Sequence, residues 1–568
     1  MSEHRPDAPI ADAIPDTVVD PARLHEQPFD ELAVTLSGGG YRAAAFHLGV
    51  LDMLHRLGLL QSVRVLSTVS GGTLTGMKYA LSVVEGVGFE DFYKGFRDFL
   101  TDNNVIGDAL GDFQDQPGTP FEGQMPSLIR GAASVYASPA LFGDKRLEVL
   151  LDNETSHLKE VSFNATEFST GNYFRMQRSE SAAADIGNEN FSVKREVARM
   201  MRLADIAAAS SCFPGAFEPI RFPDDFLWPK NLEEVRNDLG PRFKSCVALM
   251  DGGIYDNQGV DSVLTTYRRK GNKIGLVIIS DTNQRSPVSD TGAPASPSDA
   301  RKPQRDPLFD FKPERRRGHL KLGTINKLAW VAFILAVLSF VALLVAGWRS
   351  ALAHAAAPGG YRSGDMFLDF LLYGFPLLLS AVVAAGLFWL RRRAEEGQKS
   401  VAELTTIELW PYARTLTASE LIYLIGGRAK SSLALTSSVF MKRVRDLIYR
   451  DVNVYALYEG RQFSNLIYDL DDTGKFRDEV VEKLKPEELS GLAREAEGVA
   501  TALWLKGPED LKNLIACGQA TTCFNLMRYI LESRAAQLAT PGSREAEIYA
   551  LADPLWQQLR ANRYALLR

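Results

Sequence analysis

The chain has 568 residues, of which 46% are hydrophobic and 24% charged, and its net charge is -6. That length allows roughly two to four domains, and the mild charge gives no electrostatic footprint for nucleic acid. The four cysteines form no C-x-x-C pair and have no histidine beside them, which argues against zinc and favours a reducing compartment. Neither a metal nor a cofactor is expected.

The first elements predict a parallel sheet. Residues 1–29 lack the apolar core of an export signal and predict a flexible leader, or a pro-segment that packs on the core. The apolar run 32–36 predicts a strand, a helix is expected from about Ala43 to Leu57, and 63–66 predicts a second strand. A strand, a helix and a strand in this order favour a parallel sheet with helices on its faces.

Three glycines follow the first strand, at 38–40. Glycines there let the backbone approach a ligand and point several N–H groups at one spot. No Gly-Lys-Ser/Thr follows, so a Walker loop is excluded. Gly38, Gly40 and Ala43 satisfy the G-x-G-x-x-A pattern of dinucleotide binding, but the next strand lacks the acidic end that would bind ribose. The alternative is an oxyanion hole, whose backbone donors would meet the charge on an attacked carbonyl oxygen.

Ser70 lies between the second strand and a small-residue segment, 74–80, that predicts a helix. A serine on a sharp strand-to-helix turn with glycine neighbours is the nucleophile-elbow pattern of serine acyl hydrolases, with a helix N-terminus behind the hydroxyl. The match to G-x-S-x-G is imperfect, because Thr68 occupies the first glycine position.

The following stretch predicts the rest of an α/β unit. The expected elements are a helical lid or insertion at 85–150, a strand pair at 161–166 and 172–176, a helix end at 206–211, a proline-fixed loop at 212–219, and strands at 247–250 and 274–279, the last closing the sheet. Asp251 follows a strand, where catalytic residues of parallel sheets gather. None of the seven histidines is placed as in a hydrolase triad, and His47 and His55 are predicted to be structural. Asp251 is therefore the candidate general base, and burial would raise its pKa.

Four blocks, at 38–42, 68–72, 208–219 and 251–253, resemble the patatin-like phospholipase family in their order. The resemblance covers about residues 30–285 and implies a three-layer α/β/α fold with a mostly parallel central sheet and a Ser-Asp dyad. It implies Ser70 as nucleophile, Asp251 as general base, Gly38, Gly39, Gly40 and Gly71 as the oxyanion hole, and Arg42, Gly72, Gly252 and Gly253 as supporting residues. Thr68 and Ala43 depart from the family pattern. Thr68 is expected to narrow the elbow, which puts turnover in question rather than the fold.

Two uncharged apolar runs, 328–348 and 370–390, follow a linker and basic juxtamembrane segment at 284–327. Each run of about 21 residues would be roughly 31 Å long as a helix, enough to cross a bilayer. They predict a transmembrane hairpin over 328–390. Lys and Arg are more frequent on its outer flanks than in its loop, so an integral protein of the cell or inner membrane is expected, with the catalytic domain and both termini cytoplasmic.

The C-terminal part, 391–568, returns to soluble helical patterning, with helix starts expected at Pro486 and Pro508. Its stretch 502–524 resembles the helical tail of patatin-like proteins. The hairpin would then be an insertion, and the C-terminal region would complete a catalytic domain that begins with 30–283.

Taken together, these features predict a membrane-anchored serine lipid acyl hydrolase that releases fatty acid from membrane phospholipid through an acyl-enzyme. Two alternatives stay open. One is an esterase or transacylase acting on neutral lipid or acyl-CoA, and the other is a catalytically inactive membrane scaffold. No oligomeric state is predicted.

Overall fold

A computed structural model describes residues 27–111, 121, 127–181, 184–214, 217–269, 274–285, 322–356, 368, 370–405, 444 and 461–568. Residues 1–303 and 435–568 form one compact unit, here called the sheet unit, and 304–434 form a second, the hairpin unit. Most of the predicted leader, most of the linker at 284–327, and parts of the hairpin loop and of 391–568 lie outside the described residues.

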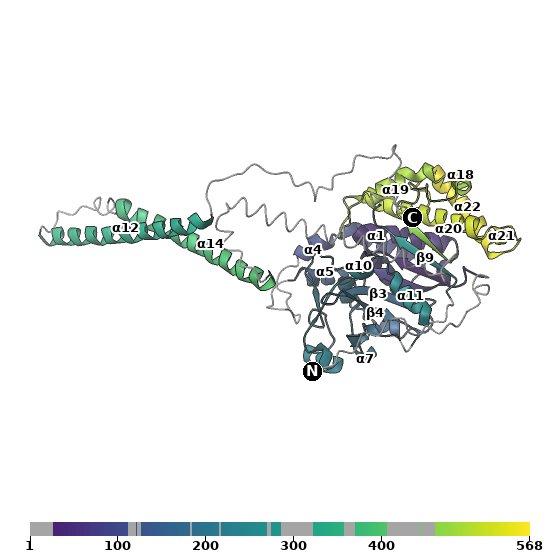
Figure 1. The fold of residues 1–568 in the computed structure, drawn as a ribbon, viewed down its shortest axis with the longest axis horizontal. Helices are drawn as coiled ribbons and strands as arrows, with labels where there is room; N and C mark the ends of the chain where they lie inside the picture. The colour runs from purple at the N-terminus through teal and green to yellow at the C-terminus, as the bar shows by residue number, and fades with distance from the viewer. Residues whose placement is uncertain are drawn as a thin grey trace, which may run out of the picture. The chain divides into compact units, whose positions relative to one another are not determined.

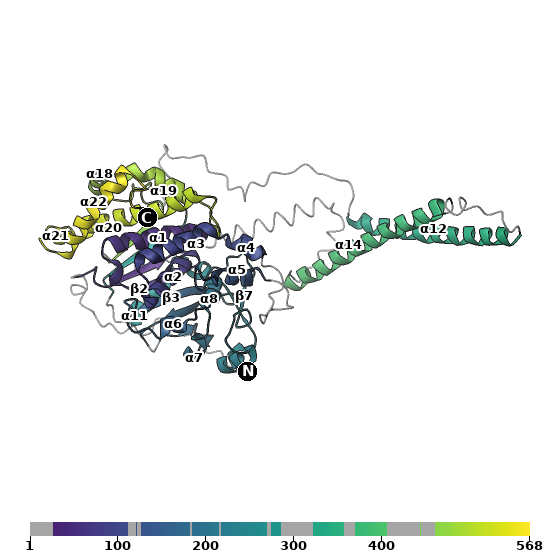
Figure 2. The same ribbon diagram turned by 180° about the vertical axis from the view of Figure 1, so that it is seen from behind.

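A ten-stranded sheet forms the centre of the sheet unit (Figures 1 and 2). One side of it is parallel, in the order β10 (Gln462–Leu466), β9 (Leu276–Asp281), β1 (Leu32–Leu36), β2 (Val63–Val69) and β3 (Glu160–Glu167). The remaining strands join antiparallel: β4 (Asn172–Arg178), β5 (Ile186–Gly187), β6 (Ser192–Val193), β7 (Ile220–Phe222) and β8 (Val247–Asp251). The α/β fold with a central, largely parallel sheet is therefore confirmed.

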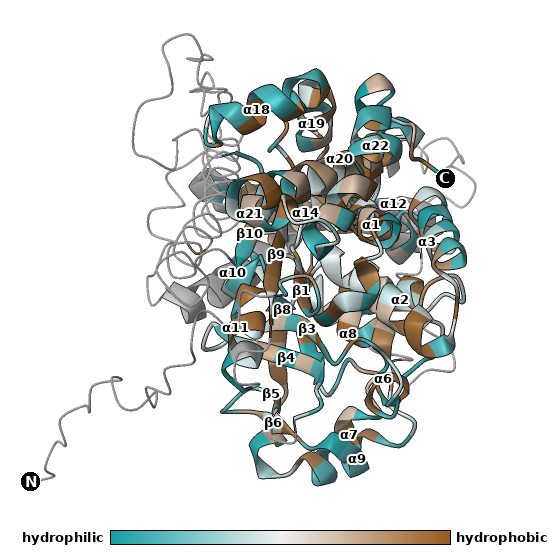
Figure 3. Ribbon diagram, turned by 90° about the vertical axis from the view of Figure 1, so that its right-hand side faces the viewer, coloured by the Kyte–Doolittle hydropathy of each residue, from teal (hydrophilic) through white to brown (hydrophobic). Residues whose placement is uncertain are grey.

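Successive residues of a strand point to opposite faces of the sheet, and the buried side chains divide accordingly into two cores. In β9, Leu276 and Ile278 belong to the larger core, whereas Val277 and Ile279 belong to the smaller one. The smaller core also contains Val260 and Leu264 of α11 (Val260–Arg269). Figure 3 shows β9 in brown and the outer helix α18 (Asp478–Leu484) with teal segments. Both faces of the sheet are thus covered.

The larger core contains side chains from several helices. Among them are α1 (Gly40–Arg56), α2 (Gly71–Glu85), α3 (Phe89–Asp102), α4 (Val105–Gly111), α5 (Leu128–Tyr136) and α8 (Leu203–Ser210). Shorter helices are α6 (Glu148–Leu151), α7 (Arg195–Ala198), α9 (Leu232–Leu239) and α10 (Gly253–Asp256). Both α1 and α2 begin further toward the N-terminus than predicted. The prediction placed their starts too late because glycine is unfavourable in a helix, and each of these helices begins with glycine.

The C-terminal region is part of the sheet unit. Helix α20 (Pro508–Ser533) packs against α1 backbone to backbone, since an added Cβ at Gly49 would lie 2.1 Å from the Ile515 carbonyl oxygen, and one at Gly518 would lie 2.0 Å from that of Phe46. The other elements there are η7 (Pro486–Leu489), α19 (Ser490–Glu497), α21 (Ala535–Leu538) and α22 (Arg544–Ala561).

Strand β10 corrects the prediction that 274–279 closes the sheet and that the C-terminal part is only helical. It pairs in parallel with the outer side of β9, with Gln462 opposite Val277. Strand β10 is only five residues long, and three of them are polar. Its buried Asn465 donates from the side-chain amide to the Thr522 hydroxyl of α20 at 3.1 Å, which compensates for the burial. A polar residue that is paired across elements gives no apolar alternation to detect in the sequence.

The hairpin unit contains α12 (Leu322–Ala356), a π-helical turn (Phe370–Gly374) and α14 (Phe375–Thr405). The Trp330 ring near the start of α12 meets the Phe388 ring of α14, with centroids 5.7 Å apart. One stretch in the described chain, Lys327–Leu352, is long and apolar enough to cross a membrane, and it contains the predicted run 328–348.

The second predicted run, 370–390, differs from expectation. Its first five residues form the π-helical turn, so the apolar α-helical part is only Phe375–Trp389. That length falls short of a membrane span within the described residues, and two complete transmembrane helices are not supported. Pro376 lacks the N–H that would extend helical bonding into the preceding turn.

Candidate active site

The strand register brings Ser70 and Asp251 together. Strand β3 pairs with β2 along its first half, where Val69 lies opposite Asn164, and with β8 along its second half, where Ala165 lies opposite Asp251. Because β2 is parallel and β8 antiparallel to β3, their carboxyl ends meet. Asp251 was expected at the end of a parallel strand, and the antiparallel β8 corrects that detail.

Ser70 sits at the turn from β2 into α2 with φ +52° and ψ −120°. Such a conformation costs a non-glycine residue about 1–3 kcal/mol. Its neighbours must be small: a Cβ at Gly71 would lie 1.9 Å from the Gly40 carbonyl oxygen, and one at Gly72 would lie 2.3 Å from that of Leu36. The predicted elbow therefore has the backbone of a strained strand-to-helix turn.

Asp251 is buried, with 2% of its surface exposed. Its carboxylate accepts a hydrogen bond from the Ser70 hydroxyl and one from the Gly253 N–H at 2.7 Å. Burial raises the pKa of Asp251 to about 6, although both hydrogen bonds lower it. A carboxyl with this pKa is ionised at neutral pH and binds a proton more tightly than an exposed aspartate, as a general base requires.

The glycine loop at 38–40 lies beside Ser70. A Cβ at Gly38 would be 3.1 Å from the Cβ of Ser70, and Gly39 and Gly40 have φ values of +143° and +60°. The first amides of a helix have no partner inside it, and Gly40 and Gly71 are the first residues of α1 and α2. The Gly38 N–H instead donates to the Asn257 carbonyl at 3.0 Å, so Gly38 contributes close approach rather than a donor.

Side chains of α1 and of the segment just after β9 form hydrogen bonds to the start of the glycine loop. Thr282 donates through its hydroxyl to the Gly38 carbonyl at 3.0 Å and through its N–H to Ser37 Oγ, also at 3.0 Å. The His47 ring lies 3.1 Å from the Ser37 carbonyl through Nε2 and 3.1 Å from Ser280 Oγ through Nδ1. Since a carbonyl only accepts, Nε2 carries the proton, and burial lowers the pKa of His47 to about 4. His47 is a neutral support.

The loop between α19 and α20 covers the glycine loop from the other side. The Tyr41 N–H donates to the Ala502 carbonyl at 2.7 Å, and Arg42 Nη1 donates to the Val499 carbonyl at 3.0 Å. A Cβ at Gly40 would lie 2.3 Å from the Ala502 carbonyl oxygen, which leaves no room there for a dinucleotide phosphate. Burial lowers the pKa of Arg42 to about 10, so it stays cationic at neutral pH. These backbone acceptors were missed because a carbonyl leaves no trace in the sequence.

Comparison with protein families agrees with this geometry. The patatin-like phospholipase model matches residues 34–264. Residues 34–264 are a patatin-like phospholipase domain. The matched range contains the glycine loop, Ser70 and Asp251.

Among solved structures, human GIVD cytosolic phospholipase A2 is similar, with 14% identity and a TM-score of 0.32 over 50% of this chain. The chain spans about half the length of that protein, with 53% covered. A likeness at this score supports no conclusion about substrate. No curated protein matches the chain.

Thr68 fits the patatin-like domain without distorting the elbow. It is buried in β2, and its hydroxyl lies 3.1 Å from the Ser162 carbonyl and 3.0 Å from Thr73 Oγ1. A Cβ at Gly76 of α2 would lie 2.4 Å from the Thr68 methyl carbon. The Thr68 methyl therefore fits because Gly76 has no side chain. The expectation that Thr68 narrows the turn therefore has no support in the contacts.

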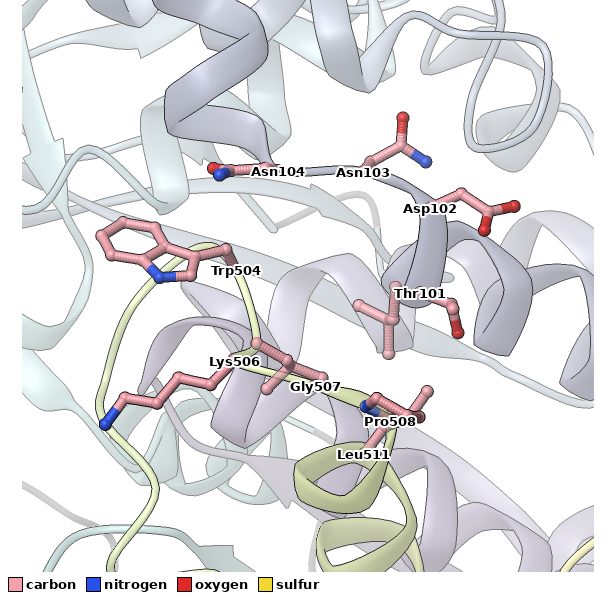
Figure 4. A pocket seen from close by; sticks show the side chains of 11 residues that line it. Thr101, Asp102, Asn103, Asn104, Trp504, Lys506, Gly507, Pro508 and Leu511 are labelled. Atoms are coloured by element: carbon pink, nitrogen blue, oxygen red, sulfur yellow. The ribbon is translucent and has the colours of Figure 1, made fainter.

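An open pocket of about 280 Å³ lies where α3 ends and α20 begins (Figure 4). Ser70 and Asp251 do not line it. The adjoining loop connects it to the domain's glycine loop, since the Val105 N–H donates to the Leu503 carbonyl at 3.2 Å, one residue after Ala502. Its lining residues are Leu100, Thr101, Asp102, Asn103, Asn104, Trp504, Leu505, Lys506, Gly507, Pro508 and Leu511.

Metal ligands do not gather in the described part of the patatin-like domain or elsewhere among the described residues, where no three His, Cys, Asp or Glu side chains could hold an ion. The buried Cys212 accepts the Asp251 N–H at its carbonyl, but its thiol donates to the Glu218 carbonyl at 2.9 Å, and burial raises the pKa of that thiol. It is a packed thiol rather than a second nucleophile.

Proposed function

We propose that this protein is a membrane-anchored serine lipid acyl hydrolase that releases fatty acid from glycerophospholipids through a Ser70–Asp251 dyad. The observation that carries the proposal is the strained Ser70, whose hydroxyl is hydrogen-bonded to a buried carboxylate with a pKa near 6. The patatin-like domain at 34–264 supports the lipid ester as the substrate class.

In the first step, the Ser70 hydroxyl transfers its proton to Asp251 while Oγ attacks the ester carbonyl carbon. The carbonyl oxygen becomes an oxyanion, and the amides of Gly39, Gly40 and Gly71 would stabilise it. The tetrahedral intermediate then collapses, the C–O bond to the lysolipid breaks, and Asp251 returns the proton to the leaving oxygen. The product left on the protein is the Ser70 acyl ester.

Water completes the cycle by the same route. Asp251 takes a proton from the attacking water, the oxyanion forms again at the glycine loop, and Ser70 leaves with the proton from Asp251. The arginine next to the loop does not contact the reacting atoms in this scheme: Arg42 binds backbone carbonyls of the covering loop and keeps the donors in place.

We infer that α12 and α14 anchor the protein in the cell or inner membrane. α12 contains the span Lys327–Leu352, and the π-helical turn at Phe370–Gly374 would lengthen the apolar part of α14 toward a second crossing. Arginines at 315–317 and 391–393 flank the apolar runs, and by the positive-inside rule both flanks, and with them the sheet unit and both termini, lie in the cytoplasm. The lipid bilayer is then both the anchor and the source of substrate.

The test is fatty-acid release from phosphatidylcholine vesicles by the purified full chain. Ser70→Ala should lower the rate by at least a thousandfold, because the nucleophile is lost. Ser82→Ala is the matched control: it removes a buried hydroxyl of α2 that bonds the Tyr79 carbonyl at 2.7 Å. Equal release by wild type, Ser70→Ala and Ser82→Ala would overturn the proposal.

A fluorophosphonate probe separates this proposal from an inactive scaffold. An activated Ser70 should form a covalent adduct that Ser70→Ala lacks, whereas a scaffold would not react. Labelling without release from phospholipid, together with release from neutral lipid or acyl-CoA, would move the proposal to an esterase or transacylase.

A further inference from the structure

Ser210, the last residue of α8, lies fully buried beneath the elbow. The Ser70 N–H donates to its Oγ at 3.0 Å, and its own proton goes to the Asn164 carbonyl at 2.7 Å. Thr73 Oγ1 lies 2.8 Å from the same oxygen, and since the Ser210 proton is committed, Thr73 is the donor. A hydroxyl has one proton and two lone pairs, so these three bonds saturate Ser210.

The backbone that follows Ser210 reaches the other half of the dyad. The Gly252 N–H donates to the Ser210 carbonyl at 3.3 Å, and the Asp251 N–H donates to the Cys212 carbonyl at 2.9 Å. One short segment, 210–212, thus holds the backbone of the nucleophile through a side chain and that of the base through carbonyl groups.

We propose that Ser210 is a positioning residue that keeps Ser70 in its left-handed conformation, a role that rests on the proposed function of the dyad. Without the hydroxyl, the Ser70 N–H would be buried and unpaired, and the strained turn would gain by relaxing. Because this bond occupies the Ser70 amide, the oxyanion must be met by the glycine loop and Gly71. Ser210 therefore also determines which amides are left for the substrate.

The experiment uses Ser210→Ala in the full-length chain in detergent. The second-order rate of fluorophosphonate labelling and kcat should fall about tenfold to a hundredfold, as for a displaced reacting group. KM should change less than about threefold, because Ser210 is buried away from substrate. The pH midpoint of activity should stay in place, because the backbone bonds to Asp251 and Gly252 remain. A purely structural role would lower the amount of folded protein but not the rate per folded molecule.

Ser211→Ala is the matched control. Ser211 is the adjacent buried serine, and its hydroxyl bonds the Ala207 carbonyl at 2.8 Å and Tyr136 Oη at 3.1 Å rather than Ser70 or Asp251. It should lose similar stability and label at the wild-type rate. Ser210→Thr keeps the hydroxyl, so it should label at most of the wild-type rate. If Ser210→Ala does not fold, Ser210→Cys, a weaker acceptor of similar size, should show an intermediate fall.

These measurements separate the positioning role of Ser210 from the proposed Ser70–Asp251 dyad on which it rests. Labelling of Ser210→Ala or Ser210→Cys at the rate of Ser211→Ala, with Ser70→Ala unreactive, would overturn the positioning role and leave the dyad standing. Activity in Ser70→Ala would overturn the dyad itself.

Discussion

The sheet unit and the hairpin unit place the same kinds of residue in opposite surroundings. Of 27 large hydrophobic side chains that are exposed among the described residues, 23 belong to the hairpin unit and four to the sheet unit. In the sheet unit, by contrast, buried polar groups such as Ser210 and Asn164 are paired across several elements. The exposed apolar surface of the hairpin unit is what the proposed membrane anchor requires, because lipid rather than water would then surround it.

This contrast also separates two ways in which a sequence specifies function. A membrane span depends on average apolarity over many residues, so single positions matter little. A catalytic site depends on a few groups held at fixed positions, so one atom matters greatly. Substitutions in the two units should therefore differ in kind.

Asp251→Asn should lower kcat by about a hundredfold to ten-thousandfold, the range for a lost general base. The amide keeps an acceptor for the Gly253 N–H but cannot take the Ser70 proton. Circular dichroism should be unchanged. A variant that retains more than a tenth of wild-type kcat would show that another group serves as the base.

The pH dependence follows from the raised pKa of Asp251. As a base it must be ionised, so wild-type activity should rise with pH, reach half its maximum near pH 6 and level off above. The free energy of unfolding should change in the opposite direction. The folded state holds the Asp251 proton more tightly than the unfolded chain does, so stability should fall as the pH rises from about 4 to about 6. In Asp251→Asn the fall should be smaller by roughly 3 kcal/mol, and the part that comes from buried Asp256, whose pKa is also raised to about 6, should remain. Denaturant titrations at both pH values measure it.

How much the sequence predicts follows the same contrast. The strand at 32–36, the elbow at Ser70 and the apolar run 328–348 were found because each rests on a local pattern. The antiparallel entry of β8, the edge strand β10 and the covering carbonyl of Ala502 were missed, since each depends on residues distant in the chain. Ser210 lay inside a block quoted for its family resemblance, but only the bond to Ser70 assigns it a task.

The hairpin should respond to charge at its centre. Leu338 and Val341 lie near the middle of the span Lys327–Leu352 and are exposed. Replacing both by Arg should make insertion less favourable by about 5–7 kcal/mol, and the protein should leave the membrane fraction. In detergent, fluorophosphonate labelling of Ser70 should be unchanged, because the site belongs to the other unit.

The control for the hairpin places the same substitutions at the ends of α12. Leu328→Arg with Leu352→Arg should stay in the membrane fraction, since arginines near the interface extend their side chains toward the headgroups. If the central and terminal pairs fractionate alike, α12 is not a membrane span, and its exposed side chains must be covered by protein.

Thr68→Val should have the smallest effect, and it tests the one residue that departs from the elbow pattern. Valine keeps the methyl that packs beside Gly76 and removes only the hydroxyl near Ser162 and Thr73. A stability loss of about 1 kcal/mol is expected, with kcat within about threefold of wild type, because the Ser70 amide still has its acceptor.

Thr75→Val is the matched control for Thr68, since it removes a buried hydroxyl of α2 that bonds the Ala44 carbonyl at 2.9 Å. Equal stability loss and equal kcat in the two variants would mean that Thr68 only fills and pairs its site. A much larger fall in kcat for Thr68→Val would instead mean that its hydroxyl orients Thr73, and through Thr73 the hydroxyl of Ser210. Thr68 would then be the first member of a hydrogen-bonded chain that ends at the nucleophile.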